Sequence, residues 1–232
     1  MNDIFLPGLG EQIDFLFPNL KEASKILVVG AETYRIAEKL KSHFNAQVEI
    51  VVEDYESLIN TNLLLGDEKS IKAKLMEFDH LDYEDNSFDL IYSQGSISLH
   101  KRNKIVKEMK RVLSAEGHFF VGEIVKNQAD VPRFVDDIFD QSFILPLLKD
   151  ELNKYYLERN FEIIAEKNLS YTLKRFYSTT LEKMKEKEGE LSDKERSYYK
   201  KVINKINHEA KSFLKSGADK HIGFYTLLLK KK

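Results

Sequence analysis

Lys25-Ile-Leu-Val-Val29 is a short apolar run, rich in β-branched residues, and Gly30 follows it directly. Such a run is typical of a strand that is buried on both faces of a sheet. Apolar residues then recur at helical spacing as far as Phe44, and Val48-Glu-Ile-Val-Val52 is a second run of the first kind. A strand, a helix and another strand in this order predict a βαβ crossover, and therefore a parallel sheet.

The same alternation continues along the chain and defines the expected fold class. We expect an α/β protein with a doubly wound, mostly parallel, seven-stranded Rossmann-like sheet, formed by residues 1–232 as one domain. The core covers about residues 20–125, and helical elements at about 132–160 and 176–216 form a lid. Capping boxes predict helix starts at Thr179-x-x-Glu182 and Ser192-x-x-Glu195. The five further strands are predicted over residues 74–78, 88–92, 117–125, 161–167 and 222–229.

Composition excludes several classes of protein and of chemistry. The 232 residues are 42% hydrophobic and 32% charged, a balance that can bury a core and argues against disorder. The chain has no cysteine, which excludes disulfides, thiolate metal sites and cysteine nucleophiles. No window approaches 18 consecutive apolar residues and the N-terminus lacks a basic n-region. We therefore expect a cytoplasmic protein without a membrane span or secretory signal.

The charges are unevenly distributed. Residues 1–173 hold 20 Lys/Arg against 30 Asp/Glu, whereas residues 174–220 hold 13 against 8. An acidic main body repels phosphate backbones, so nucleic acid is not an expected partner. We interpret the basic section near the C-terminus as a solvated helix face.

Other ligand classes lack their motifs in this chain. Six histidines are scattered singly, so no metal site is expected. The sequence contains neither a phosphate-binding P-loop nor a Gly-x-Ser-x-Gly elbow. The loop after the first strand has one glycine where dinucleotide binding needs Gly-x-Gly-x-x-Gly, and it places Glu32 against the phosphates. A nicotinamide-dependent dehydrogenase is therefore disfavoured.

Candidate binding residues are found at the strand ends. In an open parallel sheet, ligands bind outside the carboxyl ends of the strands. The residues after the first four strands are 30–37, Glu53 and Asp54, 77–81, and 92–96.

Two longer segments carry a resemblance to a known family. Phe78-Asp-His-Leu-Asp-Tyr-Glu-Asp-Asn-Ser-Phe-Asp-Leu-Ile-Tyr-Ser93 looks like the linker and fourth strand of class I S-adenosylmethionine-dependent methyltransferases, in particular their small-molecule branch. Glu108-Met-Lys-Arg-Val-Leu-Ser-Ala-Glu-Gly-His-Phe-Phe-Val121 looks like the helix, turn and fifth strand that follow. Leu6-Pro-Gly-Leu-Gly10 is similar to an entry segment of some members. The resemblance covers residues 6–125 and the last strand.

This resemblance implies S-adenosylmethionine as the cofactor and a role for each matching position. A glycine at the first loop lets the methionine portion approach the backbone, because glycine leaves room and tolerates positive φ. The resemblance assigns Gly30 and Ala31 to that loop, Glu53 to the ribose hydroxyls with Asp54 next in line, Glu77 and Phe78 to adenine, and Ser93 to the methionine portion.

The first loop departs from the family pattern at three positions. An acidic residue and two further glycines are usual there, and this chain has Val28, Glu32 and Tyr34 instead. Val28 cannot hold the cofactor's ammonium group. Glu32 places a carboxylate near the cofactor's own carboxylate unless it meets the ammonium. Tyr34 adds bulk where helix and strand usually approach closely.

Methyl transfer from a sulfonium needs a general base only when the acceptor arrives protonated. Glu123, near the end of the fifth strand, has the best predicted placement for that base, and His100 comes next. His118 lies at the start of the same strand and is interpreted as structural.

The sequence therefore predicts a methyltransferase that acts on a small-molecule acceptor beneath a lid of the N-terminal segment and the helical elements. One alternative is a catalytically silent binding or assembly protein that uses the stripe from Tyr199 to Leu214 as a homodimer face. Another is an enzyme with a modified sulfonium cofactor, accommodated by Glu32 and Tyr34. The aromatic candidates for the pocket wall are Phe134, Phe139, Phe143, Tyr155, Tyr156 and Tyr177.

Overall fold

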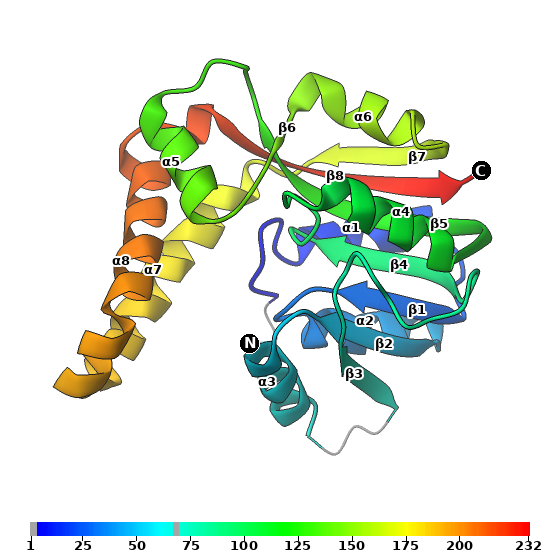
Figure 1. Cartoon of the computed structure of the whole chain (residues 1–232), viewed down its shortest axis with the longest axis horizontal. Coiled ribbons are helices and arrows are strands. Elements are labelled where there is room, and N and C mark those ends of the chain that lie inside the picture. The colour runs from blue at the N-terminus through cyan, green and yellow to red at the C-terminus, as the bar shows by residue number, and fades with distance from the viewer. Residues whose placement is uncertain (1–3, 67–69) are drawn as a thin grey trace.

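The structure is a computed structural model that describes residues 4–66 and 70–232. Within these residues one sheet has the strand order β3-β2-β1-β4-β5-β8-β7, and β6 pairs with β5 off this path (Figure 1). All pairings are parallel except those of β8, which is antiparallel to β5 and to β7. The predicted α/β class with a mostly parallel sheet is confirmed. The strands are β1 (Lys25–Val29), β2 (Gln47–Val52), β3 (Ile71–Leu75), β4 (Phe88–Gln94), β5 (Leu113–Lys126), β6 (Leu147–Leu148), β7 (Phe161–Asn168) and β8 (Ile222–Lys231).

Helices cover both faces of the sheet because its central strands are apolar on both sides. Alternate residues of β1 belong to two separate cores: Ile26 and Val28 to one, Leu27 and Val29 to the other. The first core is closed by α1 (Glu11–Asn19), α2 (Tyr34–Phe44) and α3 (Tyr55–Leu65), and the second by α4 (Arg102–Val112) and α6 (Lys149–Leu157).

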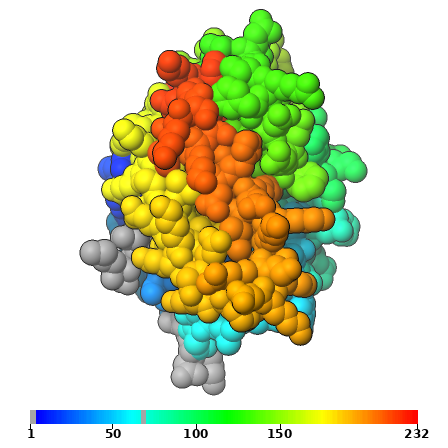
Figure 2. All heavy atoms as spheres, turned by 90° about the vertical axis from the view of Figure 1, so that its left-hand side faces the viewer, coloured from blue at the N-terminus to red at the C-terminus, as the bar shows by residue number. Residues whose placement is uncertain are grey.

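A third core joins the remaining helices into a cap. It contains α5 (Arg133–Gln141), α7 (Thr172–Glu190) and α8 (Asp193–Lys215), together with Phe224 of β8. Figure 2 shows α7 in yellow and α8 in orange side by side, with α5 in green at their upper end. The hairpin of α7 and α8 lies on the side of the sheet where the parallel strands end (Figure 1).

This cap corrects the expected lid in one respect. All of the helical elements at about 132–160 were expected to lie in the lid, but α6 covers the sheet, and Tyr155 and Tyr156 are packed in the core under it. Of the other aromatic candidates, Phe139 and Tyr177 are buried in the third core, Phe134 packs against it, and Phe143 is 69% exposed. None of these six side chains lines the cleft described below.

The apolar stripe of α8 is divided between the cap and solvent. Ile203, Ala210 and Phe213 are buried, whereas Tyr199 and Val202 are exposed. A homodimer face on this helix therefore stays a prediction. In the described part of the chain, no helix combines the length and the apolar character needed to cross a membrane.

Three predicted boundaries were wrong for identifiable reasons. The third strand covers residues 71–75 and not 74–78, because Ile71 is the residue that packs into the core. The fifth strand begins at Leu113, which pairs with Phe88, and an irregular register follows that pair. Thr179 lies inside α7 and starts no helix, whereas the capping box of Ser192 and Glu195 is present at the start of α8.

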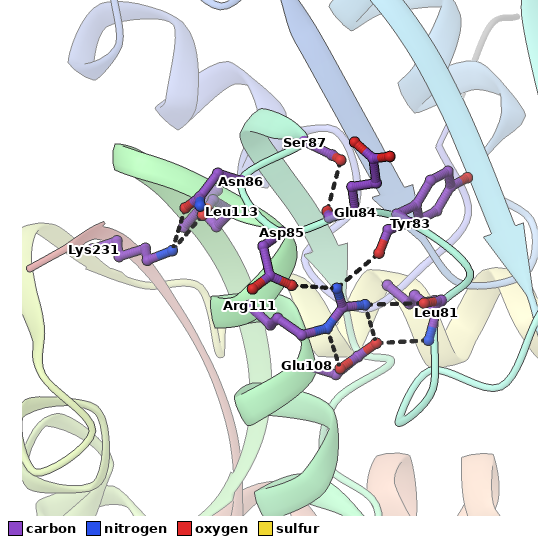
Figure 3. A network of polar contacts seen from close by, with 10 residues as sticks. All are labelled: Leu81, Tyr83, Glu84, Asp85, Asn86, Ser87, Glu108, Arg111, Leu113 and Lys231. Carbon is purple, nitrogen blue, oxygen red and sulfur yellow. Dashed lines mark hydrogen bonds and ion pairs between the residues drawn. The ribbon is translucent and has the colours of Figure 1, made fainter.

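Arg111 of α4 holds the linker between β3 and β4 in place (Figure 3). Its guanidinium donates to the carbonyl oxygens of Leu81 and Tyr83 at 3.0 and 2.7 Å, and to the carboxylates of Glu108 and Asp85 at 2.7 Å each. Glu108 in turn accepts the backbone N–H of Leu81 at 2.8 Å. The two sequence segments that carry the family resemblance are thus joined by this one network.

Arg111→Met is expected to lower the free energy of unfolding by about 1.5–3 kcal/mol, because the charged donor to two carbonyls is lost. The Arg111 hydrogen bonds hold the pKa of Glu108 below its ordinary value of 4.5. A lowered pKa stabilises the fold above pH 4.5 and ceases to do so as the pH falls through the pKa of the folded state. The difference between wild type and variant should therefore shrink in acid. Urea unfolding at pH 7 and pH 3.5 checks this, with the exposed Lys107→Met on the same helix as the control.

Candidate functional site

The loop after β1 has two residues with positive φ, and only one of them is glycine. Gly30 has φ +125°, and a Cβ there would lie 2.1 Å from the Ser96 hydroxyl oxygen, so glycine is required. Thr33 is buried and donates its hydroxyl to the Gly30 carbonyl at 2.8 Å, which closes the loop. Glu32 has φ +58°, in the left-handed region, although it carries a side chain. The loop therefore keeps a conformation that favours glycine at a position where this chain has glutamate.

Glu32→Gly is expected to raise the free energy of unfolding by about 0.5–1 kcal/mol, since the left-handed strain exceeds the entropy cost of glycine. For a chain of this size that corresponds to a melting temperature higher by about 1–4 °C. Ala31→Gly is the matched control, because Ala31 has no positive φ and should lose stability. A thermal scan that finds Glu32→Gly less stable than wild type would contradict the inference that the backbone of Glu32 is strained.

The loops after β2 and β3 are joined by a hydrogen bond. Glu53 follows β2 and accepts the backbone N–H of Phe78 at 2.9 Å. The Phe78 side chain is buried in the core of the α4 face, so only its backbone is offered to a ligand. Asp54 is the N-cap of α3 and accepts the N–H and hydroxyl of Ser57 at 2.7 and 2.6 Å. These hydrogen bonds lower the pKa of Asp54 and favour Glu53 over Asp54 as the ribose acceptor.

Glu77 is exposed and ion-paired. Its carboxylate lies 2.9 Å from Lys101 Nζ, and the same ammonium lies 3.1 Å from Asp79. Lys101 is the N-cap of α4, after the loop that follows β4. Glu53, Glu77 and Lys101 thus bring three successive strand ends together.

Ser93 and its surroundings close the end of β4. Its side chain is fully buried and its hydroxyl has no hydrogen-bond partner among the described residues. Gln12 of α1 donates to the Ser93 carbonyl at 2.9 Å, and Gln94 donates to the carbonyls of Pro7 and Leu9 at 2.7 and 2.9 Å. The N-terminal segment is thereby tied across the end of the sheet.

Glu123 lies in a buried network at the end of β5. Its carboxylate accepts the hydroxyls of Tyr156, at 2.5 Å, and of Ser98, and Arg102 lies 3.4 Å away. The side chains of Glu123 and Arg102 are 0% and 5% exposed. Burial raises the pKa of Tyr156, which keeps its phenol as a proton donor to Glu123. This arrangement favours a positioning role for Glu123 over the general-base role that its place in the sequence predicts. His100 is exposed in the loop after β4.

A cleft of about 610 Å³ opens between the first loop and the cap. Glu32, Tyr34 and Arg35 form its side toward the sheet, and Ile4 and Phe5 of the N-terminal segment form another side. Tyr34 is half-buried and lines this cleft. Residues of α7 and α8 complete the wall: Thr180, Lys183, Met184, Glu186, Lys187, Glu190 and Ile206.

The residues present fit the cofactor that the sequence resemblance implies. Gly30 has a positive φ that favours glycine, with Ser96 packed against it, and Glu53 provides a paired acceptor for vicinal hydroxyls. The Phe78 N–H, which Glu53 accepts here, would become a donor to a base when Glu53 turns to the ribose. Glu32 is exposed beside this loop, so its carboxylate is free to meet an ammonium group. This set of hydrogen-bonding groups thus suits a nucleoside that carries an amino-acid tail.

Sequence reasoning missed two parts of this site. Lys101 gave no signal by itself, because its two acidic partners are 22 and 24 residues away in the chain. The contacts of Gln94 with Pro7 and Leu9 span 85 to 87 residues. For the Gln94 contacts, the available signal was an amide side chain just after the strand predicted over residues 88–92.

Comparison with known proteins gives a family model that matches the core of the chain. Residues 27–121 match the family model described as a methyltransferase domain. No match to this chain is found among curated proteins.

Solved structures share the fold over almost the whole chain. A putative sarcosine dimethylglycine methyltransferase from Galdieria sulphuraria has a TM-score of 0.78 and 18% identity, covering 96% of this chain and 84% of that one. The cyclase SpnF has a TM-score of 0.75 and 16% identity, with 95% and 80% covered. Phosphoethanolamine N-methyltransferase 2 from Haemonchus contortus, solved with S-adenosylhomocysteine, has a TM-score of 0.74 and 19% identity. The aligned region covers 96% of this chain and 52% of that one.

The strand order, the matched segment and these neighbours agree with one another. The resemblance to class I S-adenosylmethionine-dependent methyltransferases that residues 78–93 and 108–121 carry is confirmed. Residues 27–121 match the methyltransferase-domain model, and the chain has the fold of the class I S-adenosylmethionine-dependent methyltransferases.

Proposed function

We propose that this chain transfers the methyl group of S-adenosylmethionine to a small-molecule acceptor bound in the cleft between the first loop and the cap. The observation that carries the proposal is the position of Glu32 and Tyr34. Glu32 belongs to the loop assigned to the cofactor's methionine portion, Tyr34 is the first residue of the helix that follows it, and both line the cleft. An acceptor in the cleft would therefore lie beside the part of the cofactor that carries the methyl group. The cleft volume of about 610 Å³ lies in the range of small-molecule sites.

The residues of the chain act mainly by binding and orientation. Gly30 and Ala31 provide backbone beside the methionine portion, Glu53 accepts from the ribose hydroxyls, and Glu77 with the Phe78 N–H recognises adenine. Ser93 closes the floor beneath the methionine portion. When bound, the cofactor supplies a sulfonium-activated methyl group that leaves as the acceptor's nucleophile attacks in line. Holding the two reactants in line is then the main contribution of the protein.

The acceptor side of the cleft combines apolar and charged groups. Ile4, Phe5, Met184 and Ile206 offer apolar surface, while Lys183 lies 3.9 Å from the Phe5 ring centroid. The exposed carboxylates of Glu186 and Glu190 lie on the same wall. An acceptor with an apolar body and a polar end suits this lining.

Met184→Trp tests the placement of the acceptor, with Lys185→Trp as the control, because Lys185 is exposed on α7 and lies outside the cleft. A panel of small-molecule acceptors is assayed for formation of S-adenosylhomocysteine. We expect Met184→Trp to raise the KM for the acceptor about tenfold or more while cofactor affinity is unchanged, and Lys185→Trp to behave as wild type. Equal turnover by both variants would contradict the placement. Cofactor binding without turnover of any acceptor would favour the silent binding protein instead.

A further inference from the structure

Lys101 is the point where the loop after β4 contacts the loop after β3. Its Nζ lies 2.9 Å from Glu77 Oε2 and 3.1 Å from Asp79 Oδ1. The Asp79 side chain is only 10% exposed, whereas those of Lys101 and Glu77 are 51% and 69% exposed. One ammonium therefore spans two carboxylates that flank Phe78 in the chain.

Phe78, between these two carboxylates, is the residue whose N–H is accepted by Glu53. Three strand ends that surround the adenosine position in our proposal are thus joined by charged groups: Glu53 after β2, Glu77 and Asp79 after β3, and Lys101 after β4. Lys101 is the cation that donates hydrogen bonds to both Glu77 and Asp79, and Lys104 adds a longer-range attraction to Asp79. Both hydrogen bonds raise the pKa of Lys101, so the ammonium stays charged.

The position of Lys101 is fixed by buried anchors on both sides of it in the sequence. Ser98 donates its hydroxyl to the buried Glu123 and accepts the N–H of Ile124 at 3.2 Å. Arg102 lies 3.4 Å from the same carboxylate and donates to the Leu145 carbonyl at 2.5 Å. The backbone that carries Lys101 therefore starts and ends in the core, and its side chain reaches outward to Glu77 from a defined place.

We propose that Lys101 is a positioning residue that makes Glu77 selective for a 6-amino purine, an inference that rests on the proposed function. Lys101 engages Glu77 through Oε2, and no described residue engages Oε1. A carboxylate oxygen accepts hydrogen bonds and donates none, so it matches the amino group of adenine and opposes the oxygen of a 6-oxo purine. Without Lys101, Glu77 is an exposed side chain with free rotamers, and this discrimination is lost.

Calorimetric titration with two probes tests the inference: S-adenosylhomocysteine and its deaminated 6-oxo analogue, S-inosylhomocysteine. Wild type should prefer the 6-amino probe by about tenfold or more, from the hydrogen-bond magnitude and the unpaired acceptor. Lys101→Met should weaken binding of the 6-amino probe about three- to tenfold and bring the two affinities closer together. Lys101→Arg, which keeps two charged donors, should restore the preference. A purely structural loss would weaken both probes equally.

Lys107→Met is the matched control, because it removes the same charge from an exposed position of α4 that contacts neither Glu77 nor Asp79. Equal affinities and equal selectivity for Lys101→Met and Lys107→Met would overturn the inference and leave the proposed function standing. Glu77→Gln should also narrow the preference, since an amide can donate to a 6-oxo group. A wild-type chain that binds neither probe would overturn the proposed function together with this inference.

Discussion

Glu123→Ala is expected to lower the free energy of unfolding by about 3–5 kcal/mol, because it leaves Arg102 buried without its counter-charge. The two side chains are 0% and 5% exposed, so solvent cannot replace the lost partner. The hydroxyls of Tyr156 and Ser98 would also lose their common acceptor. Urea unfolding of wild type and variant measures the difference.

Glu123→Gln separates the charge from the hydrogen bonds. The amide oxygen still accepts from Tyr156 or Ser98, so we expect a smaller loss of about 1.5–3 kcal/mol. Tyr156→Phe removes one donor to the carboxylate and should also cost about 1.5–3 kcal/mol. If the free energy of unfolding of Glu123→Ala lies within about 1 kcal/mol of the wild-type value, the buried network does not stabilise this end of β5. A role at the reacting atoms then becomes the better account of Glu123.

Glu53→Ala is expected to weaken binding of S-adenosylmethionine about tenfold or more, because a charged acceptor to two ribose hydroxyls is lost. Without ligand, Glu53 accepts the Phe78 N–H. Removing Glu53 should still cost little stability, because its side chain is exposed and water can replace it as the acceptor of that N–H. Calorimetry gives the affinity and urea unfolding gives the stability.

Asp54→Ala is the neighbouring control and should show the opposite pattern. Asp54 caps α3 through the N–H and hydroxyl of Ser57, so its loss should cost about 1 kcal/mol of stability. Cofactor affinity should stay within a factor of two or three of wild type. Equal loss of affinity in both variants would show that the loop after β2 is disturbed as a whole, and unchanged affinity in Glu53→Ala would remove Glu53 from the site.

Much of the fold could be predicted because its signals are local. Lys25–Val29 and the helix after it have the periods of a buried strand and an amphipathic helix, and the order of elements then fixes a parallel sheet. The boundary errors arose where two local signals competed. Glu116 and Gly117 predict the end of a helix, whereas β5 already begins at Leu113. Glu116, within that strand, has φ +63°, which makes the strand irregular there.

The candidate site was predictable in its strand ends and not in its contacts. Gly30, Glu53 and Glu77 follow strands, so topology alone brings them to one edge. Glu123 was nominated as a base from its place near a strand end, but its partners come from α4, α6 and the loop after β4. Those partners are 21 to 33 residues away in the chain. Such long-range hydrogen bonds leave no periodic pattern in a sequence.

The measurement that tests the account most directly is calorimetric titration of the wild-type chain with S-adenosylmethionine and S-adenosylhomocysteine. The site built from Gly30, Glu53 and the Phe78 N–H predicts micromolar binding of both, although Val28, Glu32 and Tyr34 replace residues usual in the first loop. Folded protein that binds neither compound would contradict the assignment of this site to the cofactor.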